Sequence, residues 1–206
     1  MSATDIQYPP GKSPFHVKGV VYLGLREYFA EQILGGLEAL TKEFPDDELR
    51  AFFAGQFLTG GWYDALPLLP ILTAASQAKS ISLPQVIREG SRFQARRDIR
   101  GIHRLLLKLV SPEHVVVRLP RVLPQYFDFC KAETTIVGRG HAESWLEGMP
   151  VPLIPWWRPA AETFTSTALT MAGAREVGAF WYEPEPMGEA HGVSVVRLRS
   201  RITWSR

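Results

Sequence analysis

Apolar residues in the first part of the chain recur every three to four positions, which is the period of an α-helix with one buried face. One such stretch covers 20–40, and a second follows the acidic start Asp46-Asp47-Glu48, where carboxylates favour the amino end of a helix. A short third helix is predicted over 68–78, with Asp64 as its candidate cap. The first part of the chain is therefore predicted to form a layer of helices.

A longer and more basic helix is predicted from Pro84 to about Val110, because proline suits a first helical turn. Gly90 and Gly101 weaken its middle, so we expect a bend or a break there. One face of this helix is apolar and is predicted to pack on the core: Phe93, Ile99, Ile102, Leu106 and Leu109.

After Phe129 the pattern changes to an alternation of apolar and polar positions, which is typical of β-strands. Two strands, over 130–137 and 141–146, are predicted to form a hairpin around Gly138-Arg139-Gly140. A helix then begins at Pro159, after a loop that contains Trp156 and Trp157.

Two further strands are predicted over 177–182 and 193–204, with the proline-rich segment 183–188 as a loop between them. The sequence therefore predicts an α+β fold. An N-terminal helical layer packs on a four-stranded antiparallel sheet, and the C-terminal half has the order strand, strand, helix, strand, strand.

The composition is that of one packed domain, with 206 residues of which 46% are hydrophobic and 21% charged. We expect a single domain over 15–206 after a flexible lead-in, 1–14. Cys130 is the sole cysteine and the first residues show no signal stretch, so a cytoplasmic location is expected. No apolar run reaches the roughly 18 residues that span a bilayer. The formal charge of +2 predicts no nucleic-acid partner.

Four strings follow one another along the chain: Val17-Lys18-Gly19-Val20-Val21, the segment 61–70, Val117-Arg118-Leu119-Pro120-Arg121 and Ile202-Thr203-Trp204. In this order they resemble the myxobacterial paralogous domain family of unknown function, whose members have about 200 residues, and the resemblance covers nearly the whole chain. The family is itself similar to the fold shared by haem nitric-oxide/oxygen-binding domains, 4-vinyl-reductase domains and vesicle-tethering transport-particle subunits.

The resemblance implies helices packed on an antiparallel sheet, with a small apolar ligand, haem or an acyl chain held between the layers. It carries no established activity, and fold alone does not settle function. Related folds pair through helices, so a homodimer is expected by analogy. We expect a non-enzymatic sensory or regulatory module of bacterial signalling, in which ligand binding shifts helix packing. The predicted ligand-binding residues lie between the basic helix and the sheet: Phe93, His103, Leu106, Tyr126 and Phe129.

Haem would require an axial ligand, and 118–129 contains no histidine. The tyrosine-serine-arginine clamp that holds the propionates in gas-sensing haem domains is not recognisable either. His103 and Tyr126 are the residues considered as haem ligands, with Arg118 and Arg121 as partners of carboxylates. The expectation is that no cofactor is bound, with haem as the minor alternative. The five histidines are scattered, so no metal site is predicted, and no nucleophile or phosphate-loop motif indicates an enzyme.

Arginines at four-residue spacing form a stripe along the basic helix, opposed by few acidic residues. A solvated helix face is the ordinary interpretation of such a stripe. The alternative function is a protein-interaction module without a ligand, which docks through this stripe or through the adjacent tryptophans of the 156–157 loop. The residues of this alternative are Arg88, Arg92, Arg96, Arg100, Arg104, Trp156 and Trp157.

Overall fold

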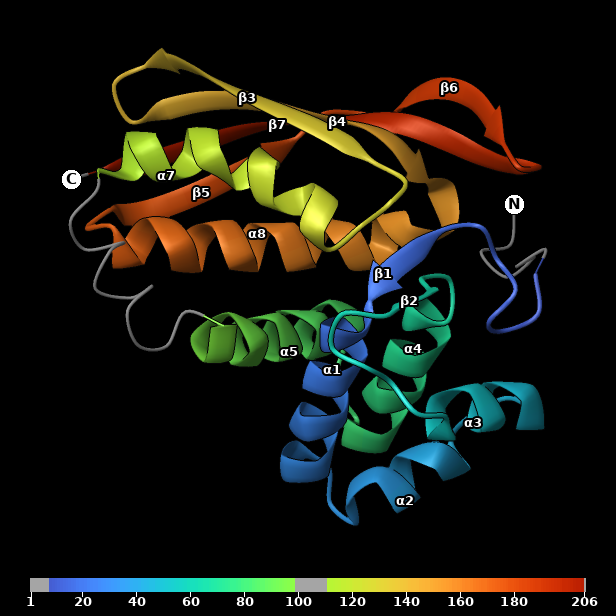
Figure 1. The fold of residues 1–206 in the computed structure, drawn as a ribbon. Coiled ribbons are helices and arrows are strands. Elements are labelled where there is room, and N and C mark those ends of the chain that lie inside the picture. The colour runs from blue at the N-terminus through green and yellow to red at the C-terminus, as the bar shows by residue number, and fades with distance from the viewer. Residues whose placement is uncertain (1–7, 99–110, 206) are drawn as a thin grey trace.

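The computed structural model describes residues 8–98 and 111–205. The first half is helical, as the apolar periodicity predicts, and contains a small two-stranded sheet (Figure 1). The strands of this small sheet pair in antiparallel fashion. Its elements are β1 (His16–Lys18), α1 (Gly19–Gln32), α2 (Gly36–Lys42), α3 (Asp47–Ala54), β2 (Trp62–Asp64), α4 (Leu68–Lys79) and α5 (Leu83–Asp98).

The stretch 20–40 forms two helices rather than one. Gly35 and Gly36 separate α1 from α2 with positive φ angles of 82° and 61°, a backbone conformation that glycine adopts without strain. The acidic start of α3 acts as predicted, because the Asp46 side chain accepts a hydrogen bond from the Leu49 amide at 2.7 Å.

Asp64 does not cap α4, whose N-cap is Pro67. Its buried carboxylate instead accepts backbone hydrogen bonds from Gly11 at 2.9 Å and from Ser13 at 3.0 Å. The part of the predicted lead-in that the structure describes, from Tyr8 onward, is thus attached to β2. The predicted continuation of the basic helix to Val110 lies outside the described residues, since α5 is described as far as Asp98.

The second half contains the main sheet, in the spatial order β3-β4-β7-β5, with β6 pairing a further part of β7. All its pairs are antiparallel. The α+β fold class is therefore confirmed. The elements are α7 (Pro112–Arg118), η1 (Leu119–Gln125), β3 (Lys131–Gly138), β4 (His141–Pro150), η2 (Val151–Leu153), α8 (Ile154–Met171), β5 (Arg175–Trp181), β6 (Glu185–Ala190) and β7 (Val193–Ser205).

The sheet has one strand more than predicted, because β6 occupies much of the segment expected as a loop. Pro186 lies opposite Val196 in this strand. Proline is acceptable here because β6 has a strand partner on one side, β7, so a missing amide donor on the other side breaks no ladder bond.

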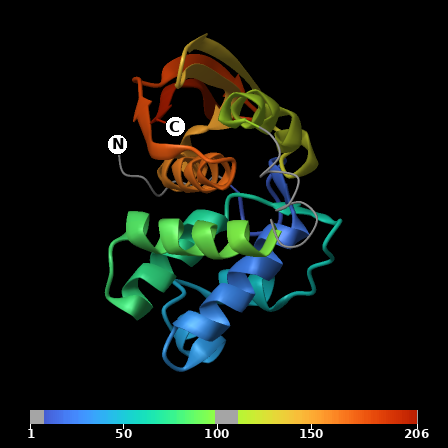
Figure 2. The ribbon, with the colours of Figure 1, turned by 90° about the vertical axis from the view of Figure 1, so that its left-hand side faces the viewer.

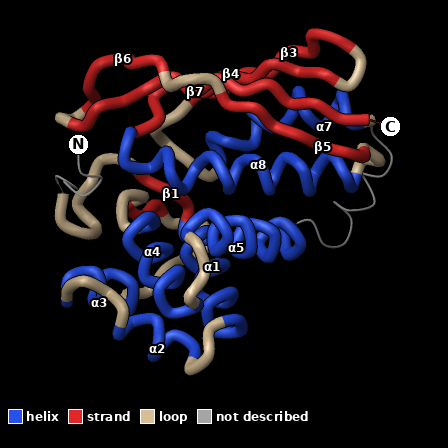
Figure 3. Tube along the Cα trace, turned by 180° about the vertical axis from the view of Figure 1, so that it is seen from behind, coloured by secondary structure: helices blue, strands red, loops and turns tan. Residues whose placement is uncertain are grey.

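The helices form two levels beneath the sheet. Helix α8 lies along one face of the sheet with α7 beside it, and α5 runs on the far side of α8 (Figures 1 and 2). Helices α1, α2, α3 and α4 lie further from the sheet, as Figure 3 shows from behind. One large core cluster contains residues of both halves, among them Phe29, Ile87 and Leu198, and a second lies between α7, α8 and β7.

Candidate ligand cavity

A cavity of about 440 Å³ lies between α5, α8, the η1 segment and the inner face of the sheet. Most of the side chains around it are apolar. This volume is within the range of roughly 300–1,000 Å³ that is usual for small-molecule sites. The apolar lining includes Ile87 of α5, Leu119 and Leu123 of η1, Trp156, Trp157, Ala160 and Ala161 of α8, and Leu198 of β7.

Small side chains on facing elements leave this space open. Ala160 and Ala161 lie on α8, and Ala132 and Ala179 lie on the sheet strands β3 and β5. Larger side chains at these positions would fill part of the space. The small residues of α8 and the sheet therefore leave room for a small molecule.

A partly exposed ion pair lies beside the cavity. The Arg88 guanidinium on α5 lies 3.4 Å from Glu162 Oε2 on α8, and the Arg88 side chain is 47% exposed. The other carboxylate oxygen, Oε1, accepts a hydrogen bond from Trp181 Nε1 at 2.8 Å. Glu162 thus connects α5, α8 and β5 beside the cavity.

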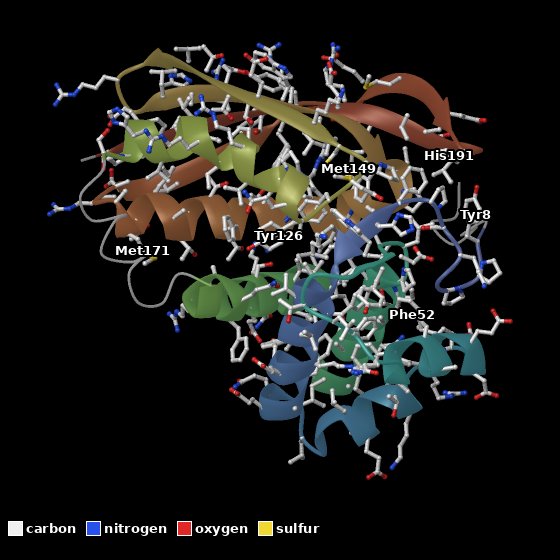
Figure 4. All side chains as sticks on the ribbon, viewed as in Figure 1. Tyr8, Phe52, Tyr126, Met149, Met171 and His191 are labelled. Carbon is white, nitrogen blue, oxygen red and sulfur yellow. The ribbon has the colours of Figure 1, made fainter. Side chains whose placement is uncertain are left out.

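The predicted ligand-binding residues are only partly brought together. Tyr126 lines the cavity, between the sheet layer and the helices below (Figure 4). Phe93 packs on Tyr28, with ring centroids 5.8 Å apart, and is not part of the lining. Phe129 contacts Phe15 and Phe127, and it is Phe127 that lines the cavity. The other two predicted residues, His103 and Leu106, lie outside the described residues.

The arginine stripe is also divided. Arg88 and Arg92 line the cavity, whereas Arg96 is exposed and is not part of the lining. Arg100 and Arg104 lie outside the described residues. Arg88 and Arg92 are exposed as well as lining the cavity, so the docking role of the stripe stays a prediction.

The prediction of a loop at Trp156 and Trp157 is wrong. Both residues lie in α8, which begins at Ile154, and each is only 7% exposed. Pro155 is acceptable in the first helical turn, so the helix begins before Pro159, the start that the sequence predicts. Both tryptophans line the cavity and cannot present a docking surface.

Sequence reasoning missed the polar part of the lining. Thr134, Ser144 and Ser200 reach the cavity from β3, β4 and β7, and Glu162 reaches it from α8. The signal was present in the last strand, where Ser200 falls on the same alternating face as Leu198 and is 6% exposed.

Two other kinds of site are absent from the described residues. There, no group of three or more histidine, cysteine, aspartate or glutamate side chains is placed to hold a metal ion. In the same ranges, no helix is both long and apolar enough to cross a membrane.

The chain is similar in fold to H-NOX domains, the haem nitric-oxide/oxygen-binding domains, over nearly its whole length. A Cs H-NOX mutant with 4-cyano-L-phenylalanine superposes with a TM-score of 0.65 at 12% identity, covering 92% of this chain and 97% of that one. A point mutant of T. tengcongensis H-NOX gives a TM-score of 0.61 at 12% identity, covering 91% and 95% of the two chains.

An oxygen-binding H-NOX domain related to soluble guanylate cyclases gives a TM-score of 0.59 at 12% identity, covering 91% of this chain and 93% of that one. At this identity the likeness establishes the fold alone. No family model matches the sequence, and no curated protein matches it. The resemblance to the myxobacterial family therefore stays a prediction.

The expectation that no cofactor is bound is contradicted by these comparisons, which point to haem as a possible cofactor. Two of the similar solved structures are described by their haem, one for its redox potential under porphyrin distortion and one for haem distortion in the H-NOX family. The question is therefore whether the residues that line this cavity can bind haem.

The described residues do not fit a haem with a histidine ligand. The described lining of the cavity contains no histidine, cysteine or methionine, and Tyr126 is its one residue of a type that ligates haem iron. Helix α7 presents Val116 to the cavity, while His114 of the same helix is exposed, with Nδ1 3.0 Å from the Ser111 hydroxyl. We therefore derive no chemistry through a haem iron.

Proposed function

We propose that this protein is a non-enzymatic sensory module of bacterial signalling that binds a small, largely apolar molecule between α5, α8 and the sheet. The observation that carries the proposal is the cavity of about 440 Å³, whose lining is mostly apolar. Burial of apolar ligand surface there would be favourable by roughly 25 cal/mol per Å². The fold shared with H-NOX domains supports the proposal, since one of those neighbours is described as oxygen-binding.

The structure offers a route from the cavity to the rest of the molecule. Helix α5 faces the cavity with Arg88 and Arg92, and its Glu89 is bonded to Lys79 of α4 and to Tyr28 of α1. A ligand that displaces α5 relative to α8 would therefore also displace the contacts of α5 with the helical layer. A ligand can transmit a signal only if it binds one packing arrangement of these helices more tightly than the other.

A cavity-filling variant tests the proposal. Leucine in place of Ala161 projects into the space next to Trp157, so Ala161→Leu is expected to weaken binding of the fluorescent apolar probe 1-aminoanthracene at least roughly tenfold. The matched control is Ala51→Leu, since Ala51 is an exposed residue of α3 far from the lining. Unchanged binding by Ala161→Leu, or no binding by the unaltered protein, would contradict the proposal.

Haemin is titrated in parallel, with the absorbance spectrum as the readout. In the described lining, Tyr126 is the one residue whose side chain is of a type that ligates haem iron. Any haem band that forms is therefore expected to be lost in Tyr126→Phe. A band that is unchanged in that variant would show that the iron is held elsewhere, and Tyr126 would then be excluded as the ligand.

A further inference from the structure

Three hydroxyl side chains lie side by side on the inner face of the sheet. Thr134 of β3 pairs with Ser144 of β4, and Ser144 pairs with Ser200 of β7. All three line the cavity. We call them the hydroxyl row. The neighbouring inward pairs are apolar, Leu146 with Leu198 on one side and Ala142 with Ile202 on the other.

Buried hydroxyls are unfavourable unless they are hydrogen-bonded. Thr134 Oγ1 donates to Ser144 Oγ at 2.9 Å, and Ser144 Oγ donates to the Glu133 carbonyl oxygen at 3.2 Å. Within the described residues these bonds account for the hydroxyls of Thr134 and Ser144 but not for that of Ser200. Ser200 is nevertheless buried, since only 6% of it is exposed, and it faces the cavity.

The surroundings of Ser200 also indicate the charge of its partner. Trp181 of β5 is directly opposite Ser200, and its Nε1 donates to Glu162 Oε1 at 2.8 Å. The second oxygen of that carboxylate is paired with Arg88 at 3.4 Å. Since Glu162 and Arg88 offset each other's charge, this ion pair next to Trp181 favours neither a cationic nor an anionic ligand group, and a neutral oxygen fits beside it.

We propose that the ligand of this cavity is a neutral, largely apolar molecule with one hydrogen-bonding oxygen, and that the Ser200 hydroxyl binds this oxygen, with Ser144 next to it. The proposal rests on the proposed function of the cavity and adds the chemical class of its ligand. Apolar walls select the body of the ligand. The hydroxyl row selects a neutral oxygen over a hydrocarbon, because a hydrocarbon would cover the Ser200 hydroxyl without giving it a hydrogen bond.

Three probes of one shape test this ligand class: naphthalene, 2-naphthol and 2-naphthoate, each titrated by calorimetry. The unaltered protein is expected to bind 2-naphthol roughly three- to tenfold more tightly than naphthalene, from one net hydrogen bond. Ser200→Ala is expected to remove that preference while leaving naphthalene affinity within about twofold. The matched control is Ser194→Ala, because Ser194 lies on the same strand but is exposed.

The outcomes separate the two proposals. Loss of the naphthol preference in Ser200→Ala alone would support the ligand class, and the retained naphthalene affinity shows that the variant has folded. A preference that survives in Ser200→Ala, or equal affinities in the unaltered protein, would overturn the ligand class while leaving the cavity function intact. Tightest binding of 2-naphthoate would overturn it too, in favour of an acid held by Arg88 and Arg92. Failure of all three probes to bind would overturn both.

Discussion

Cys130 shows how burial decides the chemistry of a single residue. It precedes β3, is 6% exposed and has no disulfide partner. Burial raises the pKa of the Cys130 thiol to about 12, with the nearby Asp128 carboxylate acting in the same direction. The thiolate is the reactive form of cysteine, so this residue is a structural part of the core and not a nucleophile.

The corresponding prediction concerns alkylation. At pH 8, iodoacetamide is expected to modify native Cys130 at least roughly a hundredfold more slowly than the urea-unfolded chain, because the native thiol is protonated and covered. Mass spectrometry of the alkylated chain over time measures both rates. Equal rates in the two states would show that the thiol is accessible and ionised in the fold.

Trp156 and Trp157 are residues whose local structure the sequence does not predict. Their aromatic side chains suggest a functional role, but the flanking prolines have the pattern of a loop. Pro155 instead lies in the first turn of α8, and the helix directs both indoles to the cavity. Proline gives the same local signal before a helix and within its first turn, so sequence alone does not separate the two.

At the scale of elements, a polar cluster connects α1, α4 and α5. Glu89 Oε2 on α5 accepts hydrogen bonds from Lys79 Nζ at 2.6 Å and from the Tyr28 hydroxyl at 2.8 Å. The Lys79 hydrogen bond is the main reason why the pKa of Glu89 is lowered, with the Tyr28 hydrogen bond acting in the same direction and burial opposing both.

This shift predicts how stability depends on pH. A carboxyl with a lowered pKa in the folded state stabilises the fold above its unfolded pKa, about 4.3 for glutamate, and loses that contribution as the pH falls through the folded value. Glu89→Gln is expected to lower the free energy of unfolding by about 1 kcal/mol at pH 7 and to reduce the loss of stability on acidification. Urea unfolding at a series of pH values measures both effects.

The control is Glu38→Gln. Glu38 pairs with Lys42 within α2, and its side chain is 84% exposed, so its removal is expected to leave the acid profile of stability almost unchanged. An acid profile of Glu89→Gln that coincides with that of the unaltered protein would contradict the role assigned to this cluster.

Most helices are predictable because each has a clear hydrophobic period, as in α3, and the β3–β4 hairpin is predictable from the glycines of its turn. The exceptions are decided by glycine and proline. Gly35 and Gly36 divide the first helix in two, and Pro186 hides the strand β6. Both residue types allow more than one structure locally, and in these cases the tertiary contacts select the one observed.

At the scale of the whole molecule, the α+β class follows from the change of period along the chain, whereas the cavity does not. Thr134, Ser144 and Ser200 become neighbours only through the pairing of β3, β4 and β7. Tyr126 is the one predicted ligand-binding residue that the structure places in the described lining, because it lies where the helices meet the sheet. Volumes between layers depend on the packing of all elements at once, which no local pattern encodes.

The central claim, that the space between α5, α8 and the sheet binds an apolar molecule, is tested most directly by a crystal structure of the protein soaked with 2-bromonaphthalene. Its bromine is located by anomalous scattering. We expect a bromine peak within the cavity, in contact with Trp157 and Leu198. A structure in which the protein's own side chains fill this space, or in which bromine binds only at other sites, would contradict the claim.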